Sequence, residues 1–112
     1  MTTHPIKTDA TRLTMLADIL RDFAGGTTEH QRRRLAEALT TLGSITTDEA
    51  MRYLDIYGPR PRVYEMRHEL GWDITTVMET GITEAGEKHL IGRYVLTGLP
   101  PALTQAADPE AA

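Results

Sequence analysis

The sequence predicts a mainly α-helical domain that ends in a C-terminal β-hairpin. Its 112 residues are enough for one hydrophobic core and too few for two. Before Gly71, apolar residues recur at the three- and four-residue spacing of amphipathic helices, and beyond it they alternate with polar residues as they do in strands. Length and this change of period together indicate one domain with its helices first and its strands last.

The first predicted helix starts at a cap on Thr8 or Asp9 and runs to about Ala24, where two glycines stop it. One face of this helix is apolar and consists of Leu13, Leu16, Leu20 and Phe23. That face packs either on the core of its own domain or on a second copy of the chain. We favour a homodimer through residues 8–24, because a small domain has few other places to bury these side chains.

The next two helices are marked by their caps. The second begins at Thr28 and ends before Gly43, and its apolar side consists of Leu35, Ala38, Leu39 and Leu42. In the pattern Thr46-x-x-Glu49, each side chain satisfies a free backbone amide of the other residue. A short third helix should therefore cover about residues 47–54.

Two prolines open the fourth helix, residues 59–70, because a proline in the first helical turn has no amide hydrogen to lose. The first strand follows Gly71 and is marked by the alternating Trp72, Ile74, Thr76 and Met78. After a turn-rich segment, residues 80–89, a second strand covers residues 90–96. These elements form the hairpin.

The elements divide the chain into four parts. Residues 1–7 show no periodicity, and residues 97–112 combine three prolines with small residues and two acids, so we expect both ends to be mobile and the tail to be disordered. Between them lie the N-terminal helical segment, residues 8–26, and the main domain, residues 27–96.

Two helices joined by a tight turn, with one helix before them and a hairpin after them, form the winged variant of the helix-turn-helix. The stretch from residue 31 to residue 96 resembles a small helix-turn-helix family that is common in bacteriophages and prophages. The resemblance lies in the spacing of Leu39, Gly43, Thr46-Thr47-x-Glu49-Ala50, Arg62-Val63-x-Glu65-Met66-Arg67, Gly71-x-x-Ile74, His89 and Gly92-Arg93-Tyr94-Val95-Leu96. It implies a winged helix-turn-helix with an added N-terminal helix. It also implies sequence-specific binding of double-stranded DNA by a phage- or prophage-type transcriptional regulator.

The fourth helix is the element that would read DNA in such a fold. At about 100° per residue, one side carries Val63, Met66 and Leu70 and should be buried, whereas Arg60, Pro61, Tyr64 and His68 lie on the opposite side. The N-terminal half of this helix enters the major groove, where arginine can donate two hydrogen bonds to guanine. Arg60 and Tyr64 are therefore the first candidates for base contact, with His68 beside them.

Two further arginines of this helix, Arg62 and Arg67, lie toward its flanks. Arg62 lies next to Glu69, and Arg67 lies beside the apolar stripe, so each makes either a structural ion pair or a phosphate contact. At the start of the third helix, we expect Thr46 and Thr47 to hold a phosphate on backbone amides.

The run Arg32-Arg33-Arg34 spreads over about 200° of helix surface and therefore forms no single patch. We interpret it as a solvated face in preference to a binding site.

The charge balance opposes DNA binding. Twelve Lys and Arg against sixteen Asp and Glu give a net charge of −4. In the hairpin turn, Lys88 is a candidate phosphate contact, whereas Glu84 and Glu87 would repel phosphates. These features favour an alternative in which the same fold binds a host or phage protein, for example as an inhibitor of a defence or polymerase complex.

Other classes of function find no support in the sequence. The chain has no cysteine, which excludes disulfides and thiolate metal sites, and its four histidines lack the spacing of metal ligands. It contains no catalytic or phosphate-loop motif. No apolar run is long enough to cross a membrane, and the polar start does not resemble a signal peptide. We therefore expect a cytoplasmic protein that is not an enzyme and needs no cofactor.

Overall fold

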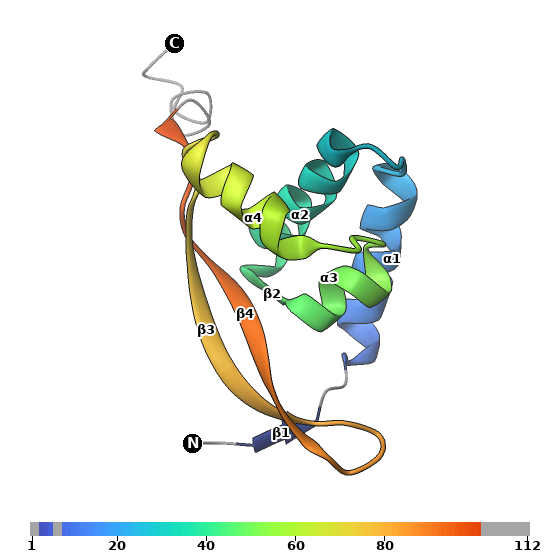
Figure 1. The fold of residues 1–112 in the computed structure, drawn as a ribbon. Coiled ribbons are helices and arrows are strands. Elements are labelled where there is room, and N and C mark those ends of the chain that lie inside the picture. The colour runs from blue at the N-terminus through green and yellow to red at the C-terminus, as the bar shows by residue number, and fades with distance from the viewer. Residues whose placement is uncertain (1–2, 6–7, 102–112) are drawn as a thin grey trace.

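The computed structural model describes residues 3–5 and 8–101. They form four helices and a four-stranded sheet, joined by turns (Figure 1). The elements follow in the order β1 (Thr3–Pro5), α1 (Ala10–Asp22), α2 (Thr28–Leu42), β2 (Ser44–Thr46), α3 (Thr47–Tyr53), α4 (Pro59–His68), β3 (Asp73–Ile82) and β4 (Lys88–Gly98). The helices pack together on one side of the long β3–β4 hairpin, which extends well beyond them (Figure 1). The predicted fold class is confirmed.

The helix caps lie where the sequence predicts them. The side chain of Asp9 accepts a hydrogen bond from the amide of Arg12 and so caps α1. Gly43 ends α2 with a φ of 82°, in the left-handed region that glycine adopts without strain. Both halves of the capping box between Thr46 and Glu49 are present at the start of α3.

The sheet has the order β1-β3-β4-β2, and its hairpin is longer than predicted. The antiparallel ladder runs from the pair Asp73 and Gly98 to the pair Ile82 and Lys88. Much of the segment 80–89 is therefore strand, and residues 83–87 make the turn. At about 3.3 Å per residue, strands of this length reach roughly 30 Å, so the hairpin forms an extended wing.

Two short strands are absent from the prediction. β2 pairs with β4 in antiparallel fashion, and β1 pairs with β3 in parallel, from Thr3 opposite Thr80 to Pro5 opposite Ile82. β1 lies inside the segment 1–7, for which the sequence predicts no regular element, and the mobility of that segment stays a prediction. At the other end, residues 97 and 98 belong to β4, and residues 102–112 of the predicted tail lie outside the described residues.

The core is built from all four helices and the wing. Its buried apolar residues are Leu16, Ile19, Leu35, Ala38, Leu39, Ile45, Ala50, Leu54, Ile56, Val63, Met66, Ile74 and Tyr94. From α1, Leu16 and Ile19 pack into this core, whereas Leu13 is exposed and Leu20 half-buried. The apolar face of α1 therefore serves its own domain, and a homodimer through residues 8–24 stays a prediction.

Leu70 departs from its predicted place on the buried side of α4. The helix ends at His68, so the helical spacing no longer holds at Leu70, which is exposed. Trp72, two residues further on, packs against the core instead.

Arg34 is the most unexpected core residue, because its side chain is only 1% exposed. Its guanidinium donates to four backbone carbonyls, those of Phe23 at 2.9 Å, Gly25 at 2.8 Å, Leu54 at 2.7 Å and Asp55 at 3.4 Å. Phe23 and Leu54 are the C-caps of α1 and α3, where free carbonyls and the negative ends of the helix dipoles attract a cation. Arg34 thus joins the α1–α2 and α3–α4 turns.

The interpretation of Arg32–Arg34 as a solvated face is therefore wrong for Arg34, and its neighbours are also engaged. Arg32 pairs with Glu65 of α4 at 3.2 Å. Arg33 is largely exposed, pairs with Glu37 at 3.2 Å and lies over the ring of Phe23. Spacing alone cannot show that a helix presents one arginine inward, because only the contacts around that residue can compensate its burial.

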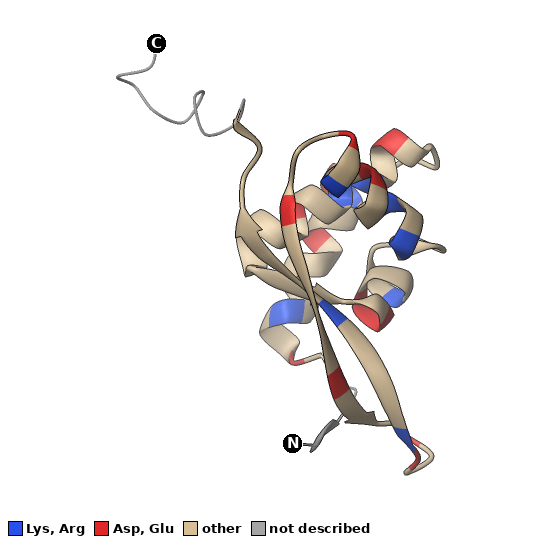
Figure 2. Cartoon of the chain, turned by 60° about the vertical axis from the view of Figure 1, so that its left-hand side comes forward, with Lys and Arg blue, Asp and Glu red and all other residues tan. Residues whose placement is uncertain are grey.

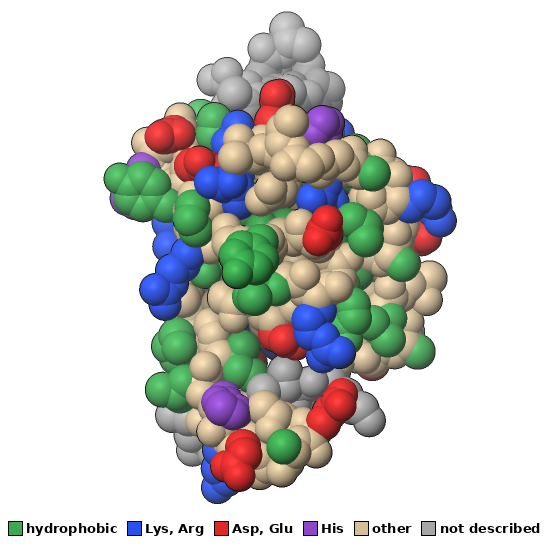
Figure 3. Space-filling view, turned by 45° about the vertical axis from the view of Figure 1, so that its right-hand side comes forward, with side chains coloured by type: hydrophobic (Ala, Val, Ile, Leu, Met, Phe, Trp, Pro, Cys, Tyr) green, Lys and Arg blue, Asp and Glu red, His purple; other side chains and the backbone are tan. Residues whose placement is uncertain are grey.

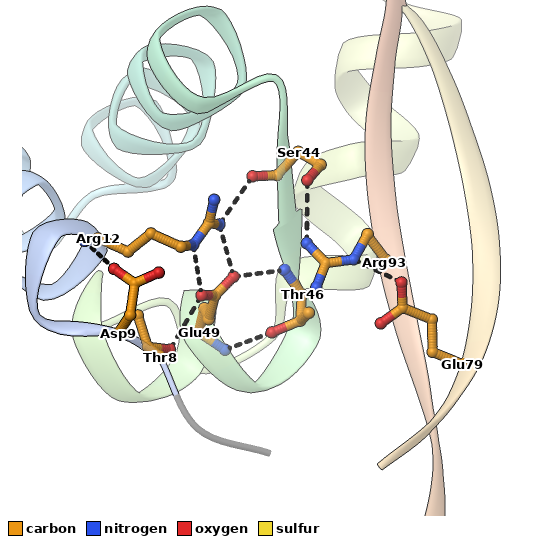
Figure 4. Close-up of polar contacts among 8 residues, drawn as sticks. All are labelled: Thr8, Asp9, Arg12, Ser44, Thr46, Glu49, Glu79 and Arg93. Atoms are coloured by element: carbon orange, nitrogen blue, oxygen red, sulfur yellow. Dashed lines mark hydrogen bonds and ion pairs between the residues drawn. The ribbon is translucent and has the colours of Figure 1, made fainter. Parts of the chain in front are cut away.

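A second polar network joins α1, α3 and the sheet (Figure 4). Arg12 of α1 donates to both carboxylate oxygens of Glu49, at 3.0 and 2.9 Å, and to the carbonyl of Ser44 at 3.1 Å. On the sheet side, Arg93 donates to Glu79 at 2.7 Å and to the hydroxyl of Ser44 at 2.9 Å. The network ties the added N-terminal helix to the helix-turn-helix and to the wing.

Glu49 is nearly buried within this network. Burial by itself would raise its pKa, but the Arg12 guanidinium, the Thr46 amide and the Thr8 hydroxyl all favour the charged form, and together they lower the pKa below the ordinary value for glutamate.

We expect Arg34→Met to lower the free energy of unfolding by about 3 kcal/mol or more, because it removes four hydrogen bonds, one of them to the buried carbonyl of Leu54. Urea denaturation followed by circular dichroism would measure this loss. The matched control is Arg33→Met on the same helix, where the exposed ion pair and the contact with the Phe23 ring should each be worth at most about 1 kcal/mol. Equal losses for the two variants would contradict the role assigned to Arg34.

Glu49→Gln should make the free energy of unfolding less dependent on pH in the acidic range. The lowered pKa means that the charged form of Glu49 stabilises the fold above about pH 4.3, the ordinary glutamate value, and that this stabilisation is lost as the pH falls through the lowered value. We expect the variant to be less stable than wild type by about 1–3 kcal/mol at neutral pH. Urea titrations over a pH series should show that the difference in free energy of unfolding between wild type and variant shrinks in acid. A difference that does not change with pH would refute this assignment.

Candidate nucleic-acid interface

Helix α4 has one buried and one exposed side, as the sequence predicts. Val63 and Met66 are buried in the core, with Pro59 buried at the first helical position. The opposite side is exposed and consists of Arg60, Pro61, Tyr64 and His68. The rings of Tyr64 and His68 lie 4.4 Å apart between centroids, one helical turn from each other. This exposed side follows the tight turn after α3, the position of a DNA-reading helix.

A groove of about 560 Å³ lies between α4 and the wing. Its lining residues are Thr47, Arg60, Pro61, Val63, Tyr64, Arg67, Thr76, Met78, Leu90, Gly92 and Tyr94. The predicted base-contacting residues Arg60 and Tyr64 therefore share one hollow with side chains from the inner face of the wing. Wing residues such as Leu90 and Tyr94 are missing from the prediction, because the register of the strands is not visible from their alternation.

Arg60 is the exposed cation of this groove. Within the described part of the chain it forms no ion pair. Its guanidinium interacts with the phenol of Tyr94 in the groove floor: burial raises the pKa of Tyr94, and the charges of Arg60 and Arg67 partly offset that rise. The guanidinium of Arg60 thus has no carboxylate partner among the described residues and lines the groove.

The side chain of Arg67 is bound to β3. Its Nε donates to the carbonyl of Ile74 at 2.7 Å, and its Nη2 donates to the hydroxyl of Thr76 at 2.6 Å. These bonds fix α4 against β3 and satisfy a carbonyl at the start of the wing. Of the two predicted roles of Arg67, the contacts favour the structural one.

Arg62 is also held by a carboxylate. Its Nε lies 2.8 Å from Oε1 of Glu65, off the line of a hydrogen bond, and its Nη2 donates to Oε2 at 3.2 Å. The partner is thus Glu65, one turn away on α4, and not the adjacent Glu69. Because Arg32 of α2 pairs with the same carboxylate, Arg62 belongs to a contact between two helices.

The N-terminal cap of α3 leaves fewer free groups for a phosphate than the sequence predicts. The amide of Thr46 donates to Glu49 at 3.1 Å, and its hydroxyl accepts from the amide of Glu49 at 3.0 Å. Thr46 is buried, so both of its capping groups are occupied inside the protein. Its neighbour Thr47 is half-buried and reaches the groove.

The wing ends in an acidic turn. Glu84 and Glu87 are exposed at its tip, and Lys88 lies beside them at the start of β4 (Figure 2). The turn is closed by Thr83, whose amide donates to the carbonyl of Glu87 at 2.8 Å, and by Gly86 with a φ of 83°. Lys88 therefore lies at the tip and is not among the residues that line the groove.

Two arginine substitutions in α4 should distinguish a residue that stabilises the fold from a residue that belongs to the candidate site. We expect Arg67→Ala to lower the free energy of unfolding by about 1–3 kcal/mol, because it removes two side-chain hydrogen bonds to β3. Arg60→Ala should stay within about 0.5 kcal/mol of wild type, since this side chain is exposed. Thermal and urea denaturation would compare them, and a larger loss for Arg60→Ala would show that Arg60 is a structural residue.

Comparisons with known proteins agree with this geometry. A family model described as a winged helix-turn-helix domain matches residues 30–98, which spans α2 to the end of β4. No curated protein and no solved structure matches the chain. In the described ranges no helix is long and apolar enough to cross a membrane, and no group of three or more histidine or acidic residues could hold a metal ion. The chain belongs to the winged helix-turn-helix domain family.

Proposed function

We propose that the protein binds double-stranded DNA sequence-specifically, with α4 in the major groove, and acts as a transcriptional regulator of the phage or prophage type. The observation that carries this proposal is the exposed side of α4, where Arg60 and Tyr64 project from the helix that follows the tight turn. The family fold supports it, because this helix reads bases in helix-turn-helix proteins.

The chemistry of α4 suits base edges. Arg60 lies in the first turn of α4, its guanidinium has no carboxylate partner within residues 3–5 and 8–101, and such a guanidinium can donate to O6 and N7 of one guanine. Tyr64 lies one turn further and can donate to or accept from a neighbouring base or phosphate. His68, Thr47 and Lys88 are the remaining candidates for phosphate contacts.

Electrostatic attraction contributes little to this binding. The net charge of −4 gives no long-range pull toward a polyanion. Arg62 and Arg67, which could neutralise phosphates, are held by Glu65 and by β3. Affinity should therefore depend on groove contacts more than on released counterions, and its dependence on salt should be shallow.

A second candidate function is protein binding with the same fold. The face shown in Figure 3 mixes hydrophobic, basic and acidic side chains and carries no continuous basic patch. The acidic tip of the wing, with Glu84 and Glu87, suits a basic protein surface better than it suits phosphates. A host or phage protein would then be the partner, and a homodimer through residues 8–24 is compatible with either function.

Two sets of substitutions should change DNA affinity in opposite directions. Arg60→Ala removes a bidentate guanine contact worth about 1–3 kcal/mol, so binding should weaken and sequence preference should relax. Glu84→Lys combined with Glu87→Lys removes two repulsive charges near phosphates, so binding should strengthen and its salt dependence should steepen. Fluorescence anisotropy at two salt concentrations, on a duplex selected from a random library, would measure both.

Arg33→Ala is the matched control, since Arg33 is an exposed arginine on α2 outside the groove. It should leave affinity nearly unchanged. If the wild type selects no duplex at low salt and neither set of substitutions produces binding, the DNA proposal fails and the protein-binding candidate takes its place.

A further inference from the structure

The inner face of the wing exposes two large apolar side chains. Met78 is 52% exposed and Leu90 is 68% exposed. In the ladder Met78 lies opposite Gly92, and Leu90 lies opposite Thr80, so Met78 and Leu90 are diagonal neighbours on one face of the hairpin. This is the face that buries Ile74 and Tyr94 against the helices nearer the base of the wing.

Met78 and Leu90 line the same groove as Arg60 and Tyr64. The glycine opposite Met78 adds no side chain there, and a Cβ at Gly92 would stand 3.5 Å from Thr47 and 4.0 Å from the sulfur of Met78. The groove thus has an apolar wall on the wing, a charged and aromatic wall on α4, and an open space between them. A ligand seated in it must offer apolar atoms on one side and hydrogen-bond acceptors on the other.

The major groove of DNA carries one apolar group that distinguishes bases, the C5 methyl of thymine, and side chains read it by apolar contact. We propose that Met78 and Leu90 form a thymine-methyl site, which selects a thymine close to the guanine bound by Arg60. This inference rests on the proposed DNA binding and adds a second specificity element from the wing. The positive charge of Arg60 in the same groove favours an anionic duplex as the occupant over a neutral apolar peptide.

The acidic wing is consistent with such a contact. Since Glu84 and Glu87 make the tip a poor partner for phosphates, the part of the wing suited to DNA is its middle, where Met78 and Leu90 are exposed on the inner face. Burying one methyl group should improve binding by roughly fourfold, which corresponds to about 0.8 kcal/mol.

Deoxyuridine provides the direct test, because it differs from thymidine only by the C5 methyl. In a duplex selected from a random library, each thymine is replaced singly by uracil, and affinity is measured by anisotropy. We expect roughly a fourfold loss at one or two positions near the guanine read by Arg60, and little change elsewhere. The double variant Met78→Ser with Leu90→Ser should bind the thymine and uracil duplexes equally and keep its preference for guanine.

Val77→Ser is the matched control, because Val77 is an exposed apolar residue on the outer face of the same strand. It should keep the thymine preference, and urea denaturation should show all variants folded. If the wild type binds its selected duplex and no uracil replacement weakens binding, or if the double variant still prefers thymine, the methyl site is refuted while the DNA proposal stands. If no duplex is selected at all, the proposed function and this inference both fail.

Discussion

The buried guanidinium of Arg34 is the interaction on which the arrangement of the helices depends. A charged side chain in the core is stabilised only if its donors find acceptors, and here four carbonyls, at the ends of α1 and α3 and in the turns that follow, accept from the guanidinium. The helix-end carbonyls among them have no partner within their own helices, so the arginine and the two turns stabilise one another. The α3–α4 turn includes Asp55, whose φ of 53° is uncommon for a residue other than glycine. Holding that turn fixes where α4 begins, and so fixes the direction in which Arg60 and Tyr64 point.

The arginines of the chain divide into two groups by what holds them. Arg12 joins α1 to α3, Arg67 joins α4 to β3, and Arg62 binds Glu65 within its own helix. Arg60 faces the groove without a carboxylate partner in the described residues. This division is compatible with the proposed role of α4 in an acidic protein, because much of the positive charge is used to position α4 and the wing. The consequence for function is a site that depends on shape and on a small number of contacts, with little general attraction for nucleic acid.

Sequence reasoning succeeds here where local rules determine the structure. Caps and helical spacing predict the four helices within a few residues, since the box at Thr46 and the glycine at position 43 act through neighbours in the chain. It fails where the deciding partner is distant. Helical spacing groups Arg34 with solvent-facing residues, because the carbonyls of Leu54 and Phe23 that bind it are not visible in the local pattern, and β1 is too short to show a pattern of its own. The candidate site follows the same division. The exposed side of α4 is predictable from helical spacing, whereas the contribution of Leu90 requires the register of the hairpin.

The central claim is that the exposed side of α4 enters the major groove of a duplex, and methylation interference tests it most directly. Dimethyl sulfate methylates N7 of guanine in the major groove and N3 of adenine in the minor groove, so one partially modified duplex samples both. Bound and free fractions are separated, and the methylated positions depleted from the bound fraction are mapped. We predict depletion of N7-methylated guanines at one or a few positions, with no depletion of N3-methylated adenines at the same base steps. Depletion confined to adenine N3, or no depletion on a duplex that the protein binds, would contradict the placement of α4.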